Sequence, residues 1–132
     1  DEAVLIDESL YLVGRKEDEG SRKPLASILD DIQENYPVLL LDHRPHHKEA
    51  LHSRMVDLQL SGHTHAGQFL PFGLMNRFLA RYVYSYVYGL YQKDLFKLIV
   101  TSGMGNWAVP YRFGSQAEFV YLDIKFERED GV

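Results

Sequence analysis

The stretch LSGHTHAGQ, residues 60–68, indicates both the fold and the chemistry of this chain. It continues the apolar run of residues 55–60 and carries two histidines, His63 and His65, separated by one residue. Imidazole is the commonest metal ligand among protein side chains. Two imidazoles at this spacing at the end of a strand can serve one metal ion, or one each of two neighbouring ions. The alternative is a polar turn in which neither histidine is a ligand.

A third histidine, His43, follows another apolar run, residues 38–41. A continuous apolar run of this length is typical of a strand that is covered on both faces. Pro45 disfavours a helical conformation at the residue before it, so the chain stays extended past His43. Open α/β sheets bind their ligands at the carboxyl ends of the strands. We therefore expect His43, His63 and His65 to meet at one edge of a sheet and to bind metal.

The other hydrophobic patterns predict an α/β layered fold. From apolar periodicity and turn residues we expect, in chain order, a hairpin or two strands over 3–14, a helix of about ten residues after Pro24, a strand over 38–41, a helix from 46 to about 54, and strands over 56–60, 95–101 and 118–126. The stretch 74–91 fits either a helical stripe or a strand alternation, and its start favours a helix. Residues 127–132 form a charged tail that we expect to be disordered.

Composition excludes several classes of protein. The chain has 132 residues, enough for one domain with a moderate core. Its net charge of −5 argues against a fold built to bind nucleic acid. The absence of cysteine excludes disulfides, thiolate metal sites and cysteine nucleophiles. Residues 1–4 resemble neither a signal peptide nor a start at an initiator methionine, so we expect the chain to be a piece of a longer protein.

Two arginines are weaker candidates for binding an anionic substrate. Arg15 and Arg112 carry the guanidinium group, which matches the geometry of phosphate, and the glycine-containing loop 102–105 lies between them in sequence. A single loop of this kind is weak evidence. The alternative is that both arginines are structural.

Two motifs resemble the calcineurin-like metallophosphoesterase family. Residues 39–45, LLLDHRP, look like the lone-histidine motif of that family, and residues 57–68, DLQLSGHTHAGQ, look like its closing Gly-His-X-His motif. Segments 12–18 and 103–112 are similar to a bacterial branch that is often tethered to membranes by N-terminal helices. The resemblance extends from about residue 3 to residue 125.

The resemblance implies a fold, an activity and a site. The family fold is a two-sheet sandwich flanked by helices, an α-β-β-α architecture, of which residues 1–126 would be the C-terminal portion of a single domain. The intact protein would hydrolyse phosphomonoesters or phosphodiesters with a hydroxide activated by two divalent ions, such as manganese, iron or zinc. His43 and His63 would bind one ion and His65 the other. The intact protein would be bacterial and membrane-associated through upstream helices, whereas this piece would be soluble.

Other family motifs are missing from the sequence. It contains no Asp-X-His and no Gly-Asp, and Gly105-Asn106 is followed by tryptophan where the family has histidine. Two-metal hydrolysis needs a bridging ligand, and three neutral imidazoles supply no negative charge. We therefore expect the chain alone to be inactive, to bind one metal ion or none, and to need the N-terminal half of the same protein. Apolar surface left uncovered should make the piece associate with itself.

Two other functions remain open on the sequence. In one, the chain is a non-catalytic module that binds one metal ion for structure, or none. In the other, it is a protein-interaction module that uses the tyrosine-rich stretch 82–91, and the histidines are incidental.

Overall fold

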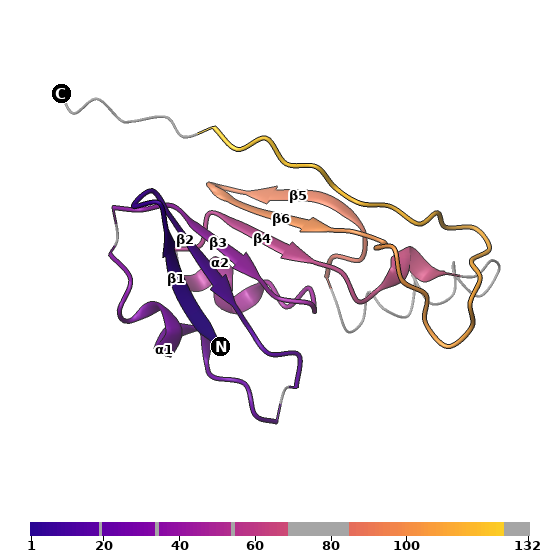
Figure 1. The fold of residues 1–132 in the computed structure, drawn as a ribbon, viewed down its shortest axis with the longest axis horizontal. Helices are drawn as coiled ribbons and strands as arrows, with labels where there is room; N and C mark the ends of the chain where they lie inside the picture. The colour runs from indigo at the N-terminus through magenta and orange to yellow at the C-terminus, as the bar shows by residue number, and fades with distance from the viewer. Residues whose placement is uncertain (19, 34, 54, 69–84, 126–132) are drawn as a thin grey trace.

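The computed structural model describes residues 1–18, 20–33, 35–53, 55–68 and 85–125 (Figure 1). Its elements are, in chain order, β1 (Glu2–Ile6), β2 (Leu10–Gly14), α1 (Leu25–Leu29), β3 (Val38–Leu41), α2 (Lys48–Ser53), β4 (Leu58–Ser61), the 3₁₀ turn η1 (His65–Gly67), β5 (Gly89–Lys93) and β6 (Phe96–Val100). The strands form one six-stranded sheet in the order β1-β2-β3-β4-β6-β5. Strands β2, β3, β4 and β6 are parallel, and β1 and β5 are antiparallel edges. This mixed sheet with few helices agrees with an incomplete α/β metallophosphoesterase-type architecture.

The hydrophobic core lies between the sheet and the two helices, which pack against each other. Side chains along each strand alternate between the two faces of the sheet. Val13 of β2 and Leu40 of β3 point to the helical face and are 0% exposed. Burying a side chain of this kind stabilises the fold by about 1.5–3 kcal/mol. The other buried members of this core are Tyr11, Leu25, Ile28, Leu29, Ile32, Val38, Ala50, Val56, Phe96, Leu98 and Val100.

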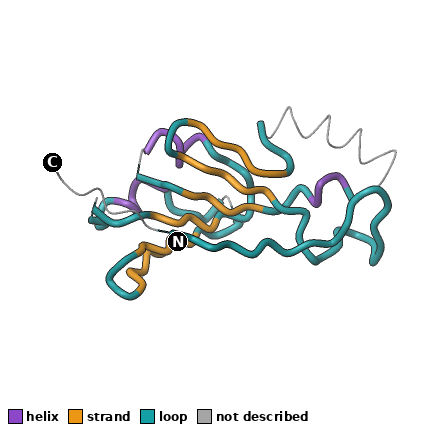
Figure 2. The backbone as a smooth tube through the Cα atoms, turned by 90° about the horizontal axis from the view of Figure 1, so that it is seen from above, coloured by secondary structure: helices purple, strands orange, loops and turns teal. Residues whose placement is uncertain are grey.

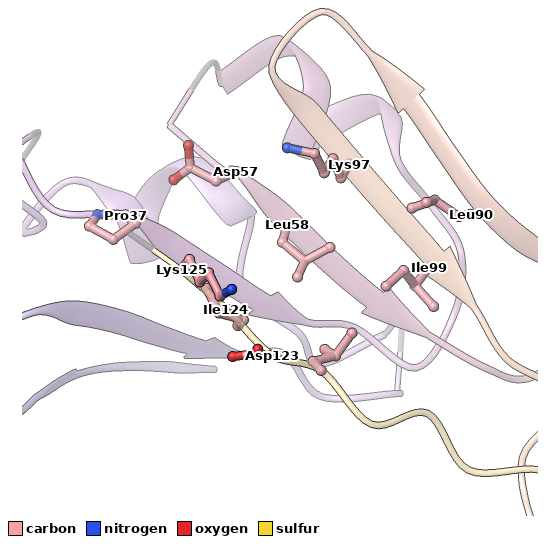
Figure 3. A pocket seen from close by; sticks show the side chains of 10 residues that line it. Pro37, Asp57, Leu58, Leu90, Lys97, Ile99, Asp123, Ile124 and Lys125 are labelled. Carbon is pink, nitrogen blue, oxygen red and sulfur yellow. The ribbon is translucent and has the colours of Figure 1, made fainter. Parts of the chain in front are cut away.

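The opposite face of the sheet is apolar but only partly covered. Leu58 and Ile99 are half-buried there, and Leu41 is 41% exposed. Residues 122–125 lie over this face and line a pocket together with Leu58 and Ile99 (Figure 3). The expectation that strand 38–41 is covered on both faces is therefore wrong in the described part of the chain. Helices cover one face, and a single extended segment lies against part of the other.

Both helices are shorter than their sequence patterns predict. α1 has five residues where about ten were expected, and α2 has six and begins at Lys48. The apolar spacing still identifies the buried side of the chain, because Ile32 beyond the end of α1 is 7% exposed. Among the described residues, no helix has the length and apolar character that a membrane crossing requires.

The strand predicted over 118–126 is wrong as far as residue 125. Residues 118–125 belong to no strand ladder, and Figure 2 shows residues 101–125 as a long loop beside the sheet. Alternation of side chains predicts an extended backbone, but a strand also needs a neighbour that completes its hydrogen bonds. Residue 126 and the tail predicted over 127–132 lie outside the described residues.

The stretch 74–91, for which the sequence favours a helix at the start, ends in an unpredicted strand. β5 (Gly89–Lys93) pairs antiparallel with β6, and Gly89 has a φ of 102°. The rings of Tyr86 and Tyr91 lie 4.2 Å apart, and both pack against the core. These two tyrosines therefore have a packing role. Residues 69–84, where a helix would begin, lie outside the described residues.

Candidate metal centre

His43 and His63 lie together at the carboxyl edge of the sheet. Each follows one of two adjacent parallel strands, β3 and β4, so both strands deliver a histidine to the same edge. The backbone N–H of Gly62 donates to the carbonyl of His43 at 2.9 Å, which joins the two loops. The ring centroids are 5.2 Å apart, and the rings meet edge to face at 84°. Two imidazoles are thereby held in one small volume.

Glu17, which the sequence did not single out, completes this cluster. One carboxylate oxygen lies 3.7 Å from Nε2 of His43, and the other lies 3.6 Å from Nδ1 of His63. One atom from each of the three side chains lies within 4.8 Å of the other two. Glu17 follows β2, the parallel neighbour of β3. Its place after a third parallel strand was the available sequence signal, because parallel strands end at the same edge.

His65 lies beside the cluster, against the loop that follows β6. Its Nδ1 is 3.4 Å from Nη2 of Arg112. Burial lowers the pKa of His65, and the charge of Arg112 lowers it further. Burial likewise lowers the pKa of His63, with Arg44 as the next cause. Both imidazoles are therefore neutral near pH 7, which is the form that binds metal ions.

The backbone of the Gly-His-X-His segment adopts a left-handed conformation at several positions. His63, His65 and Ala66 have φ angles of 66°, 48° and 50°, which residues with a side chain rarely adopt. Each such residue costs on the order of 1–3 kcal/mol and persists only where the surroundings hold it. Gly67, at φ 75°, reaches the same region without a Cβ penalty. The segment therefore stores strain at the positions that present the two imidazoles.

The buried side chain of Gln68 connects this segment to the loop after β6. Its Oε1 accepts from the backbone N–H of Trp107 at 2.6 Å. Its Nε2 donates to the carbonyls of Trp107 and Tyr111 at 2.9 and 3.0 Å. The N–H of Phe113 donates to the backbone carbonyl of Gln68 at 2.8 Å. One residue thus ties the end of the Gly-His-X-His segment to residues 107–113, a role that the sequence did not assign to it.

Known proteins share this part of the sequence. A protein of Helicobacter pylori described as an uncharacterized metallophosphoesterase is 43% identical over 91 residues, which are 67% of this chain and 24% of the relative. A transmembrane protein with a metallophosphoesterase domain from Danio rerio is 38% identical over 92 residues, 67% of this chain and 20% of the relative. A metallophosphoesterase of Aquifex aeolicus is 32% identical over 133 residues, 94% of this chain and 49% of the relative.

The chain belongs to the metallophosphoesterase family. It spans about a quarter of the length of the curated Helicobacter relative, a fifth of the Danio relative and about half of the Aquifex relative. No family model matches it, and no solved structure matches it. The resemblance seen in the two histidine motifs is therefore confirmed at the level of the family.

Arg112 fixes the conformation of the loop after β6. Its Nη2 donates to the carbonyls of Ser102 and Gly103 at 2.8 and 2.9 Å, and also to that of Gly105. Its Nε donates to Oδ1 of Asn106 at 3.1 Å. These contacts give Arg112 a structural role next to His65. A role in binding substrate stays a prediction.

Arg15 lies in a buried ion-pair network around Asp42, the residue directly before His43. Its guanidinium contacts Asp42 at 3.3 Å and Glu49 at 3.1 Å, and Arg22 contacts Asp42 at 3.3 Å. Burial raises the pKa of the Asp42 carboxyl, whereas the charges of Arg22 and Arg15 lower it. The side chain of Arg15 is 2% exposed, so these contacts account for it as a structural residue.

The donor atoms of the centre fit a divalent first-row ion. Imidazole nitrogen suits zinc, copper, iron and nickel, and carboxylate oxygen suits manganese and magnesium as well. Two imidazoles and one carboxylate together form a mixed nitrogen and oxygen donor set. The role of His43, His63 and His65 as ligands stays a prediction.

Gln68→Ala is expected to loosen the loop that follows β6. The amide hydrogen of Trp107 should exchange with solvent about tenfold to a hundredfold faster, because an unmade buried hydrogen bond costs about 1–3 kcal/mol. Hydrogen–deuterium exchange of peptides that cover residues 102–116 measures the change. Gln92→Ala is the matched control, because the exposed amide of Gln92 only donates to the nearby carbonyl of Asp94. Unchanged exchange in the Gln68 variant would contradict the proposed link.

Proposed function

We propose that this chain is the C-terminal part of a metal-dependent phosphoesterase that hydrolyses phosphomonoesters or phosphodiesters. The observation that carries the proposal is the meeting of His43 and His63 at the ends of adjacent parallel strands. Family membership supports the reaction class, because the relatives are named metallophosphoesterases. The proposed substrate is recognised by its phosphoester group.

In the proposed site, His43 and His63 hold one divalent ion and His65 holds a second. Bound divalent ions would polarise the phosphoryl oxygens and activate water as a nucleophile. The residues of this chain orient the imidazoles that would hold the ions. The Gly62 to His43 hydrogen bond fixes two imidazoles, and the Gln68 amide fixes the turn that carries His65. The missing Asp-X-His, Gly-Asp and Gly-Asn-His motifs would come from the N-terminal half of the intact protein.

Two further properties follow from the same proposal. Membrane association of the intact protein is supported by relatives from Danio rerio and Bos taurus, each named as a transmembrane protein with a metallophosphoesterase domain. Self-association of the isolated chain is supported by the partly covered sheet face, where Leu41 is 41% exposed and Leu90 is 66% exposed. A uniform monomer in sedimentation at high protein concentration would argue against self-association.

Hydrolysis of a chromogenic phosphodiester tests the proposed reaction. The intact protein with manganese should release the chromophore, and a chelator should stop the release. This chain alone should show no turnover above the chelated control, because the bridging carboxylate is missing from its sequence. Equal turnover by the chain alone would refute the need for the N-terminal half. No turnover by the intact protein with any divalent ion on phosphomonoesters or phosphodiesters would refute the proposed function.

A further inference from the structure

We propose that Glu17 is a third ligand, through its carboxylate, to the ion held by His43 and His63, so that this chain alone binds one divalent cation. The inference rests on the proposed function in one respect, the assignment of these two histidines to a single ion. It adds a residue outside both histidine motifs. It also assigns to this chain the negative charge that its imidazoles lack.

The position of Glu17 follows from the order of the parallel strands. β2, β3 and β4 are neighbours in the sheet, and their carboxyl ends deliver Glu17, His43 and His63 to the same edge. The backbone N–H of Arg15 donates to the carbonyl of Leu41 at 3.0 Å. This bond continues the pairing of β2 with β3 to a point two residues before Glu17. The carboxylate therefore comes from a backbone that is tied to the strand carrying His43.

The distances in the cluster are those of ligands around an ion. The separations of 3.7 Å to His43 and 3.6 Å to His63 are longer than hydrogen bonds, which extend to about 3.2 Å. Two ligands about 2.1 Å from a tetrahedral zinc-sized ion lie about 3.4 Å apart. The two carboxylate oxygens also face different imidazoles, Oε2 toward His43 and Oε1 toward His63. These separations match those expected of side chains that ligate one small cation.

Charge favours the same assignment. An imidazole binds a metal ion in its neutral form and does not offset the charge of the ion, whereas one carboxylate ligand offsets half the charge of a divalent ion. The competing interpretation is that Glu17 serves only as the ion-pair partner of Arg44, whose Nε lies 3.7 Å from Oε1. That contact is also longer than a hydrogen bond. It differs from the contact to His63 by 0.1 Å, so the same carboxylate oxygen faces both Arg44 and His63.

Cobalt titration of the 132-residue chain tests this inference. Calorimetry gives the affinity, and the visible absorption of bound Co²⁺ reports which atoms coordinate it. Glu17→Gln keeps the size of the side chain and removes the charge, and it should weaken binding at least tenfold and change the absorption bands. Glu2→Gln, at an exposed position of β1, is the matched control and should leave both unchanged. Circular dichroism and melting temperature show that each variant is folded.

The histidine variants separate the possible outcomes. If His43→Ala and His63→Ala lose cobalt while Glu17→Gln binds as the wild type does, Glu17 is not a ligand and the proposed function stands. Weaker binding with unchanged absorption bands means that Glu17 acts by charge alone, which also overturns the inference. If neither histidine variant changes the affinity for cobalt, His43 and His63 do not share an ion. Both the inference about Glu17 and the proposed ligand assignment then fail. No cobalt binding by the wild-type chain overturns the inference, and hydrolysis by the intact protein then decides the proposed function separately.

Discussion

Asp42→Ala lowers the free energy of unfolding by about 3–5 kcal/mol, the cost of removing one partner from a buried ion pair. The side chains of Asp42, Arg15 and Arg22 are 1%, 2% and 9% exposed. Without the carboxylate, two guanidinium groups remain in a site that solvent barely reaches. Urea denaturation followed by circular dichroism measures the change, with the chain in the same metal-free buffer for both proteins. This is the largest stability effect that we expect from a single substitution near the centre.

A matched aspartate provides the control for this experiment. Asp31 is exposed in the turn after α1, so Asp31→Ala should change the free energy of unfolding by less than about 0.5 kcal/mol. A double substitution of Asp42 and Arg15 should cost less than the sum of the two single changes, because the two residues interact directly. A decrease in the free energy of unfolding below about 1 kcal/mol in Asp42→Ala would contradict this prediction. It would mean that water or Glu49 satisfies the two guanidinium groups and that the ion-pair network does not stabilise this edge of the sheet.

His63→Ala in the intact protein is expected to lower turnover about a thousandfold. A bound ion contributes several kcal/mol of transition-state stabilisation, and about 1.4 kcal/mol corresponds to a factor of ten. His63 is proposed to share its ion with His43, so His43→Ala should have an effect of similar size. The measurement is kcat for the same chromogenic phosphodiester with manganese, together with the bound metal content of each purified variant.

His52 supplies the matched control for the histidine variants. It lies exposed on α2, away from the sheet edge that carries the centre, so His52→Ala should keep wild-type turnover. Turnover of His63→Ala within threefold of the wild type would refute its role as a ligand. Adding back manganese at high concentration should restore part of the lost activity if the substitution acts by weakening metal binding.

The hydrophobic pattern was sufficient to predict where His43 and His63 lie. Continuous or alternating apolar runs identified β3 and β4, and a helix between two strands makes those strands parallel, so their ends meet. The same reasoning did not single out Glu17, because this residue lies in a charged loop without periodicity, and its place after β2 was the only local signal. Its approach to His43 depends on how the chain after β2 turns, which tertiary contacts decide.

Two errors show what side-chain alternation leaves open. Residues 118–125 alternate as a strand does and are extended, but pairing depends on a neighbour that no local pattern specifies. β5 was missed for the opposite reason. Its sequence, GLYQK, contains a glycine and two long polar side chains, and it is a strand because β6 pairs with it. In both cases the deciding interaction lies elsewhere in the chain.

The hydrogen bonds of Gln68 hold the backbone of Trp107, which can serve as an intrinsic fluorescent probe. Trp107 is the single tryptophan of the sequence. Both of its backbone polar groups are bonded to Gln68, and the residue is 66% exposed. Its fluorescence therefore originates from one known place, a few residues along the chain from the arginine that touches His65. The wavelength of maximum emission and the quenching by added iodide can thus report structural changes around the His65 imidazole without an attached dye.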